Sequence, residues 1–131
     1  MRDIQDLVNC AQELTQAGEH EDAFLLLDAA ACRGDPKAQY MAALMLDSGT
    51  GTIQDIERAR ELCFSSAELG YAAAQACVGG FYAQGNGVEV DYEKAAYWFD
   101  KAAKQGDPTA LNDLGNMYRW GLYFEKNEEP S

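Results

Sequence analysis

The residues most able to do chemistry cluster around a single histidine, His20, in the polar segment Gly18–Asp22. His20 could act as a general base, and Glu19, Glu21 and Asp22 beside it could hold a cation weakly. However, no Ser or Cys nucleophile lies at a recognisable spacing from His20. The segment also lacks the glycine and the alternating oxygen ligands of a calcium loop. We therefore expect a solvated turn histidine and no metal site.

The four cysteines are the next candidates, and they are Cys10, Cys32, Cys63 and Cys77. They form no CxxC pair and have no histidine nearby, so the spacing argues against zinc. A small secreted scaffold would pair such residues in disulfides. We expect four buried free thiols in a reducing compartment instead.

Two Gly-x-Gly stretches, Gly49–Gly51 and Gly85–Gly87, could suggest phosphate-binding loops. No strand is expected before them and no Gly-Lys-Ser/Thr follows, so we interpret them as turns between helices. The 22 acidic residues could pair as acid and base, but chance pairs are expected at that number. The sequence shows no catalytic constellation, and we predict a protein that is not an enzyme and carries no cofactor.

The net charge of −12 argues against binding nucleic acid, because phosphate contacts need clustered Lys and Arg. The same argument disfavours anionic membranes, whereas a basic protein partner or plain solubility both remain open. No apolar run approaches the ~20 residues of a membrane span. The first residues, MRDIQDLVNCAQ, lack the basic start and apolar middle of a signal peptide, so we expect a cytoplasmic protein.

The elements that position these residues follow from an internal repeat of 36 residues. The shift places Gly34 over Gly70 and Gly106, and the same shift aligns Ala, aromatic and Asp columns. A fixed period of this length is typical of stacked helical repeats. We expect one domain over 1–131, made of a degenerate N-terminal hairpin (1–34), two repeats (35–70 and 71–106) and a C-terminal half repeat with a tail (107–131).

Apolar residues at helical spacing predict seven helices in antiparallel pairs. The expected ranges are 3–17, 21–32, 36–47, 56–69, 72–84, 92–105 and 108–120. Gly34 should end one helix in the left-handed conformation, Asp35 should cap the next and Pro36 suits its first position. Asp107 should act in the same way, and Asp55 and Asp91 should cap the second helices of their hairpins. Small residues should allow close helix approach, at Ala38, Ala42, Ala43, Gly79 and Gly115.

These columns resemble the Sel1-like repeat, a relative of the tetratricopeptide repeat. The best-matching stretch follows Ala74, and the agreeing positions are Gly79, Tyr82, Gly85, Gly87, Val88, Lys94, Ala95, Trp98 and Gly106. The resemblance covers about Gly34 to Gly121 well and the N-terminal hairpin loosely. It implies an all-α fold, a right-handed α/α solenoid with about three and a half repeats.

The resemblance also implies a non-enzymatic adaptor, since family members are mostly protein-interaction modules in bacterial signalling, secretion and virulence and in eukaryotic quality control. Secreted members carry a paired-cysteine pattern, AC-x7-C. Here Cys32 supplies its first half but Tyr40 occupies the second. That departure again favours the cytoplasm.

In such solenoids the first helix of each hairpin lines the concave side, which gives a candidate partner-binding groove. Its residues are Lys37, Tyr40, Met41, Leu44, Ala73, Ala76, Cys77, Gly80, Asn112, Asn116 and Trp120. Asn side chains can bind a peptide backbone and aromatic residues anchor interfaces. The alternative is that Tyr40, Met41 and Leu44 simply pack on the neighbouring hairpin.

Two hypotheses about the function of the chain remain open. The first is a module that binds a protein or peptide partner. The second is an acidic inhibitor, such as an immunity protein that occludes a basic toxin, because the chain is small and acidic and shows no second domain.

Two structural expectations concern the C-terminal half. Trp98 should be buried between the second and third hairpins. The last unit lacks a second helix, so its apolar residues should be covered by the tail, by a second copy in a homodimer or by a partner. These residues are Tyr118, Trp120, Leu122, Tyr123 and Phe124.

Overall fold

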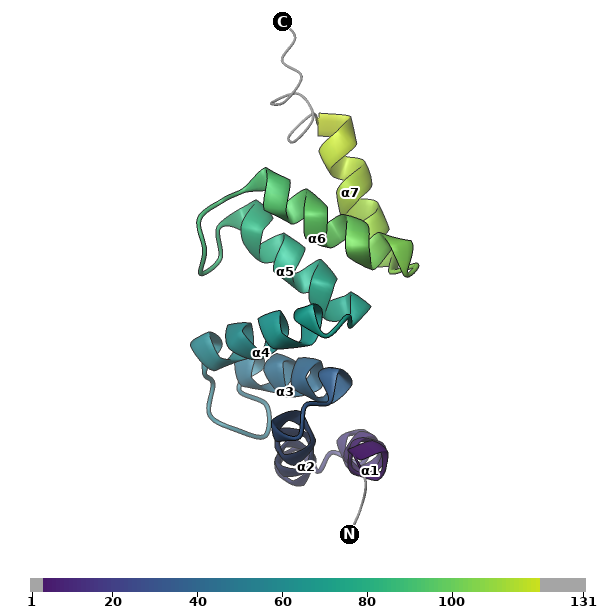
Figure 1. The fold of residues 1–131 in the computed structure, drawn as a ribbon. Helices are drawn as coiled ribbons and strands as arrows, with labels where there is room; N and C mark the ends of the chain where they lie inside the picture. The colour runs from purple at the N-terminus through teal and green to yellow at the C-terminus, as the bar shows by residue number, and fades with distance from the viewer. Residues whose placement is uncertain (1–3, 121–131) are drawn as a thin grey trace, which may run out of the picture. The chain divides into compact units, whose positions relative to one another are not determined.

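A computed structural model describes residues 4–120, and in that range the chain forms seven α-helices and no strand (Figure 1). Each helix has 13 residues, and the predicted all-α class and helix order are confirmed. None of the helices in this range has the length and hydropathy of a membrane span. The helices are α1 (Ile4–Gln16), α2 (His20–Cys32), α3 (Pro36–Ser48), α4 (Ile56–Glu68), α5 (Ala72–Gln84), α6 (Tyr92–Lys104) and α7 (Pro108–Trp120).

Aspartate side chains set the starts of four helices, as the sequence predicts. Each carboxylate accepts a hydrogen bond from the backbone N–H three residues ahead, at 2.8 to 3.1 Å. Such a cap satisfies one of the N–H groups that a helix leaves without a partner in its first turn. The capping residues are Asp35, Asp55, Asp91 and Asp107.

The turns between paired helices have the same backbone geometry in both complete hairpins. The N–H of Gly49 donates to the carbonyl of Met45 at 2.8 Å, and the N–H of Gly85 donates to that of Phe81 at 2.8 Å. Both glycines are left-handed, with φ of 74° and 73°. The Gly-x-Gly stretches therefore end helices α3 and α5, which confirms their interpretation as turns between helices.

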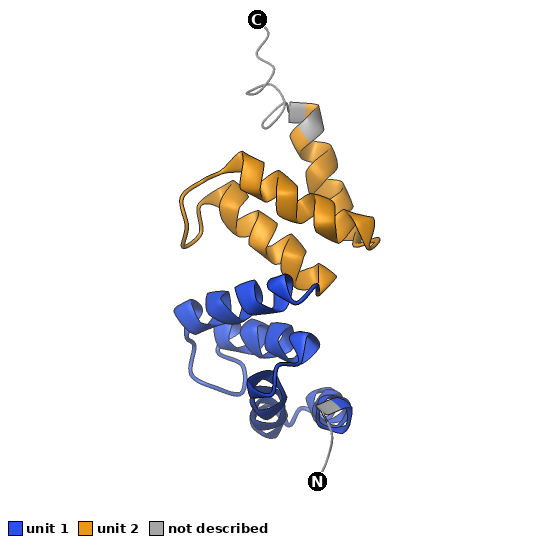
Figure 2. Ribbon diagram, viewed as in Figure 1, with its two compact units in different colours: residues 1–70 blue, residues 71–131 orange. Residues whose placement is uncertain are grey.

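The chain divides into two compact units, residues 1–70 and residues 71–131 (Figure 2). In unit 1, α1 packs on α2, α2 on α3 and α3 on α4. The core of unit 1 is rich in alanine, which lets these helices approach closely. Its buried apolar residues are Val8, Ala11, Ala23, Phe24, Leu27, Ala30, Ala31, Ala38, Ala42, Ala43, Met45, Leu46, Ala59, Cys63 and Ala67. The assignment of all 131 residues to a single domain stays a prediction.

In unit 2, α5 packs on α6 and α6 packs on α7. A Cβ atom placed on Gly79 would lie 2.7 Å from two ring carbons of Phe99. The predicted close approach at Gly79 is therefore confirmed, whereas Gly115 has no atom within 4 Å of such a Cβ and that prediction is wrong. Gly115 lies on an exposed part of α7. The core cluster consists of Ala76, Ala95, Ala96, Phe99, Ala102, Ala110 and Met117.

Trp98 is only half-buried, so the expectation of a buried indole is wrong. Its ring meets the ring of Tyr97 edge-on, with centroids 5.3 Å apart. The fully buried aromatic residue of α6 is its neighbour Phe99, with 2 % of its surface exposed. Ala95, Phe99 and Ala102 lie three to four residues apart on one helix face, and Trp98 falls at the edge of that face.

No disulfide joins the four cysteines, all of which lie in the described residues, but their burial differs from the expectation. Cys63 is buried, Cys10 and Cys77 are half-buried, and Cys32 is exposed. The prediction of four buried thiols therefore holds only for Cys63. Cys32 is exposed because it is the last residue of α2, next to the turn that ends at Gly34.

Candidate binding site

Two segments of unit 1 that lie far apart in sequence, residues 18–22 and 49–53, meet around a polar cavity of about 540 Å³. One segment is the α1–α2 turn with the start of α2, which contains Glu19, Glu21 and Asp22. The other is the loop between α3 and α4. The sequence singled out both segments but gave no sign that they would come together. The lining residues are Gly18, Glu19, His20, Glu21, Asp22, Gly49, Gly51, Thr52 and Ile53.

Gly51 holds this loop against the first turn of α2. A Cβ atom at this position would overlap the backbone carbonyl group of His20 and lie 3.1 Å from the backbone nitrogen of Glu21. Gly51 also has a φ of 74°, which L side chains rarely adopt. Only glycine therefore allows the α3–α4 loop to pack this closely on α2.

A second cavity, of about 220 Å³, lies beside the same histidine and has mostly apolar walls. The hydroxyl groups at its edge are occupied within the chain: Thr15 donates to the carbonyl of Ala11 at 2.9 Å, and Ser48 donates to that of Leu44 at 3.1 Å. The walls therefore offer mainly methyl and methylene groups. The lining residues are Thr15, His20, Leu27, Met41, Leu44, Met45, Ser48 and Thr50.

His20 lines both cavities, and the expectation of a solvated turn histidine is wrong. It is the first residue of α2, and its ring is half-buried. Its Nδ1 atom is buried and has no hydrogen-bond partner in the described part of the chain. Buried polar atoms without a partner are uncommon and carry a desolvation cost, so this nitrogen marks an unusual place in the fold.

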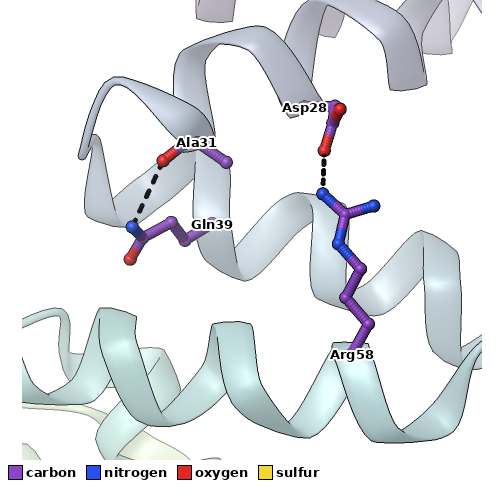
Figure 3. A network of polar contacts seen from close by, with 4 residues as sticks. All are labelled: Asp28, Ala31, Gln39 and Arg58. Carbon is purple, nitrogen blue, oxygen red and sulfur yellow. Dashed lines mark hydrogen bonds and ion pairs between the residues drawn. The ribbon is translucent and has the colours of Figure 1, made fainter.

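Polar contacts join α2 to α3 and α2 to α4 in unit 1 (Figure 3). Asp28 on α2 forms an ion pair with Arg58 on α4. Gln39 on α3 donates from Nε2 to the carbonyl of Ala31 at 3.3 Å. These contacts join three helices of unit 1, two of which, α2 and α3, also carry lining residues of the apolar cavity.

The surface predicted on α3 is partly exposed in unit 1. Lys37, Tyr40 and Met41 are half-buried, and Leu44 exposes 47 % of its surface. Met41 and Leu44 line the apolar cavity. The predicted repeat core of the same helix is buried, namely Ala38, Ala42, Ala43 and Leu46.

The residues predicted on α5 are small and mostly half-buried: Ala73, Cys77 and Gly80. Ala76 exposes 6 % of its surface and belongs to the core cluster of unit 2, so it offers little to a partner.

The predicted residues of α7 include Asn112, which is exposed, and Asn116, which is half-buried. Burial raises the pKa of the nearby Asp113 carboxyl, and the Asp107 carboxylate raises that pKa further. The side chains of Tyr118 and Trp120, and the whole of residues 121–131, lie outside what the structure describes. The predicted C-terminal apolar cluster therefore falls outside it as well.

A metal-binding role for the acidic segment finds no support in residues 4–120. No three His, Cys, Asp or Glu side chains gather there in a way that could hold a metal ion. The carboxylates of Glu19, Glu21 and Asp22 lie instead at the start of α2, where the helix dipole stabilises negative charge.

Comparison with known proteins identifies the repeat. A family model described as Sel1 repeat matches residues 36–71, 72–107 and 108–129. The chain belongs to the Sel1 repeat family. Sel1 repeats are generally protein–protein interaction modules, and the N-terminal hairpin of this Sel1 repeat protein lies outside the matched residues.

Relatives of this Sel1 repeat chain are considerably longer proteins. An uncharacterized protein of Neisseria meningitidis serogroup B is 32% identical over 85% of this chain and 23% of its own length. Protein sel-1 homolog 2 of Homo sapiens is 30% identical over 93% of this chain and 18% of its own length. The chain thus spans less than a quarter of either relative.

A solved structure confirms the fold class. The crystal structure of a Sel1 repeat protein from Oxalobacter formigenes matches 91% of this chain and 50% of its own chain, with a TM-score of 0.85 and 27% sequence identity. The predicted class, an α/α solenoid of Sel1-like helix hairpins, is therefore correct.

Proposed function

We propose that this Sel1 repeat chain binds a protein or peptide partner through exposed and half-buried residues of α3, α5 and α7. The proposed contact residues in unit 1 are Lys37, Tyr40, Met41 and Leu44. Those in unit 2 are Ala73, Cys77, Gly80, Asn112 and Asn116. Membership of a family of interaction modules supports the general role.

The observation that carries this proposal is the division of α3 into two faces. Ala38, Ala42 and Leu46 are buried in the core of unit 1, whereas Leu44 is a large apolar residue with 47 % of its surface exposed beside an apolar cavity. A cavity with apolar walls beside an exposed apolar side chain is typical of a binding site.

A second candidate is an acidic inhibitor that occludes a basic effector or toxin. The net charge of −12 supports it, because opposite charge accelerates association and strengthens binding at low salt. The two candidates differ in salt dependence. Nanomolar binding that collapses as salt is raised favours the inhibitor, and micromolar binding to several peptides that is insensitive to salt favours the adaptor.

Capture from cells of the source organism, followed by quantification of bound proteins, tests the proposal. We expect Tyr40→Ala and Asn116→Ala each to weaken recovery of a specific partner, because each removes a proposed contact. Tyr97→Ala is the matched control, since Tyr97 is 56 % exposed on α6 and is not a proposed contact. An unchanged set of partners in both contact variants would argue against the proposed surface.

A further inference from the structure

The two cavities of unit 1 differ in chemistry and share one side chain. The smaller cavity has methionine and leucine walls, and the larger one has three carboxylates at its rim. His20 lines both cavities, so a single ligand bound beside His20 can contact apolar walls and carboxylates at the same time.

The apolar cavity has the scale of one or two side chains. Its volume of about 220 Å³ lies below the ~300–1,000 Å³ of pockets that hold drug-sized ligands. Met41 and Met45 form part of its wall, and their unbranched, flexible side chains adapt to apolar groups of different shape. The cavity thus suits an apolar side chain inserted from another chain rather than a large cofactor.

The carboxylates around the larger cavity favour a ligand that carries positive charge next to its apolar group. Glu19, Glu21 and Asp22 are exposed, and the lining contains no Lys or Arg. An anion would meet three carboxylates there, whereas a Lys or Arg side chain would find complementary charge. The chain as a whole is also strongly acidic, which likewise favours a positively charged partner.

The buried Nδ1 atom of His20 gives an independent sign of a missing contact. It has no hydrogen-bond partner in the described part of the chain, and His20 itself lines both cavities. A neutral imidazole nitrogen can accept a hydrogen bond from a backbone N–H. The backbone of a bound peptide would supply such a donor once the His20 ring turns Nδ1 toward one of the cavities that it lines.

Building on the proposed function, we infer that these cavities form a peptide-binding site for a segment in which one apolar side chain is flanked by Lys or Arg. The apolar side chain enters the space between Leu27, Met41 and Leu44. The flanking cation lies near Glu21 and Asp22 at the start of α2.

The direct test is an NMR titration of the full chain with three matched synthetic pentapeptides. The first carries a leucine between two lysines, the second replaces leucine with serine, and the third replaces both lysines with glutamate. With the first peptide we expect saturable shifts at the Gly51 and Thr52 amides, the Met41 methyl group and the Nδ1 nitrogen of His20. The serine and glutamate peptides should each bind at least about tenfold more weakly, since each loses one of the two matching features.

Variants locate the site with matched controls. Leu44→Asp places a charge at the apolar cavity and should weaken the first peptide at least about tenfold, whereas Leu111→Asp, on α7 at similar exposure, should not. The double variant Glu21→Gln/Asp22→Asn should weaken it about three- to tenfold at low salt. Glu57→Gln/Glu61→Gln, which removes two exposed carboxylates of α4, should have little effect. All variants should keep the circular dichroism and melting temperature of the wild type.

Several results would overturn the inference. They are no saturable shift at millimolar peptide, shifts confined to other residues, or equal binding of the leucine and serine peptides.

The proposed function fails separately. If the captured partner is lost with Tyr40→Ala but kept with Glu21→Gln/Asp22→Asn, and the leucine peptide gives no saturable shift, the interaction role stands and the cavity site is wrong. If the peptide binds at the cavities while Tyr40→Ala and Asn116→Ala keep the partner, the cavity site stands and the wider surface is wrong.

Discussion

The hairpins α3–α4 and α5–α6 have the same backbone plan but are filled by different side chains. In the first, the N–H of Asp55 donates to the carbonyl of Leu46 at 2.9 Å, and in the second the N–H of Asp91 donates to that of Tyr82 at 2.9 Å. These pairs are 36 residues apart in sequence. The repeat therefore specifies turns and caps, which depend on a few residue types, and leaves the packing between helices free to vary.

The packing differs most at two equivalent pairs of core positions. The α5–α6 hairpin combines Gly79 with Phe99, and the α3–α4 hairpin has Ala43 and Cys63 at the corresponding positions. All four residues are buried. A missing Cβ on one helix is thus matched by a large ring on the other, and a small alanine by a small thiol. The Gly79–Phe99 pair has more side-chain atoms than the Ala43–Cys63 pair, so the same backbone plan takes fillings of different size.

The basic residue near the start of the second helix also differs in what it contacts. Arg58 of α4 forms an ion pair with Asp28 of α2. Lys94 occupies the equivalent place in α6, where it lies over the ring of Tyr82 at 5.4 Å. The α3–α4 hairpin is therefore tied to the preceding helix of its own unit by charge, whereas Lys94 contacts its own hairpin.

The largest effect should follow from Phe99→Ala, because Phe99 fills the core of unit 2. We expect a loss of about 3–5 kcal/mol in unfolding free energy, measured by urea denaturation. Cys63→Ala, the equivalent change in unit 1, removes one small group and should cost only about 1 kcal/mol. Trp98→Ala should cost less than Phe99→Ala because the indole is half-buried. If Cys63→Ala and Phe99→Ala lower the unfolding free energy equally, the two hairpins do not differ in how their cores are filled.

The helix caps should show the opposite behaviour and contribute equally in the two hairpins. Asp55→Ala and Asp91→Ala each remove a carboxylate that accepts a backbone hydrogen bond at 3.1 Å. Each should cost about 1 kcal/mol of stability, again by urea denaturation, and the corresponding asparagine variants should recover most of it. A difference of more than about 1 kcal/mol between the two positions would mean that the two caps do not stabilise their hairpins equally, although their backbone geometry is the same.

The basic residues should give smaller effects that salt distinguishes. Arg58→Ala breaks a partly exposed ion pair, whose side chains expose 39% and 32% of their surface, so the cost should be at most about 1 kcal/mol. That cost should shrink as salt is raised, since screening weakens exposed pairs. Lys94→Ala, scored by the same denaturation series, serves for comparison in α6. If the cost at Arg58 does not depend on salt, the ion pair is not what stabilises α2 against α4.

The smallest effect concerns Asp113, whose pKa is raised above the ordinary carboxyl value of 3.8 by burial and by Asp107. A raised carboxyl pKa means that the ionised form destabilises the fold, so this cost develops as the pH rises through the raised pKa. Asp113→Asn should therefore raise the melting temperature slightly at pH 7, and the gain should vanish below pH 3.8. Asp47→Asn, at an exposed carboxylate of α3, is the control. A gain that persists unchanged at acidic pH would assign it to packing instead of charge.

The sequence could predict the elements that local chemistry controls. Gly34 ends a helix, and Asp35 caps the next whatever packs around them, so the helix order and the caps followed from the repeat. The repeat could not predict which of two adjacent aromatic residues would be buried. Phe99 and Trp98 differ by one position, and the helix rotation that separates them depends on the partner helix.

The candidate site was hardest to predict because its parts are distant in sequence. His20 looked like an isolated turn residue, and Gly51 looked like a generic loop glycine. The absence of a Cβ at Gly51 lets the loop lie on the first turn of α2 and encloses the histidine. Within the sequence, the one available signal was that two unusual segments, around residues 20 and 51, each departed from a plain helical pattern.

The most direct test of the shared backbone plan is a double-mutant cycle on Gly79 and Phe99, measured by urea denaturation. In the wild type, Gly79→Ala should destabilise unit 2, because the new Cβ meets the Phe99 ring at 2.7 Å. In a Phe99→Cys background, which reproduces the pair found in the α3–α4 hairpin, Gly79→Ala should instead stabilise by up to about 1 kcal/mol, since alanine is the better helix former. If Gly79→Ala destabilises the wild type but stabilises the Phe99→Cys variant, one backbone plan accepts either pair of core side chains. The same effect of Gly79→Ala in both backgrounds, within about 0.5 kcal/mol, would contradict it.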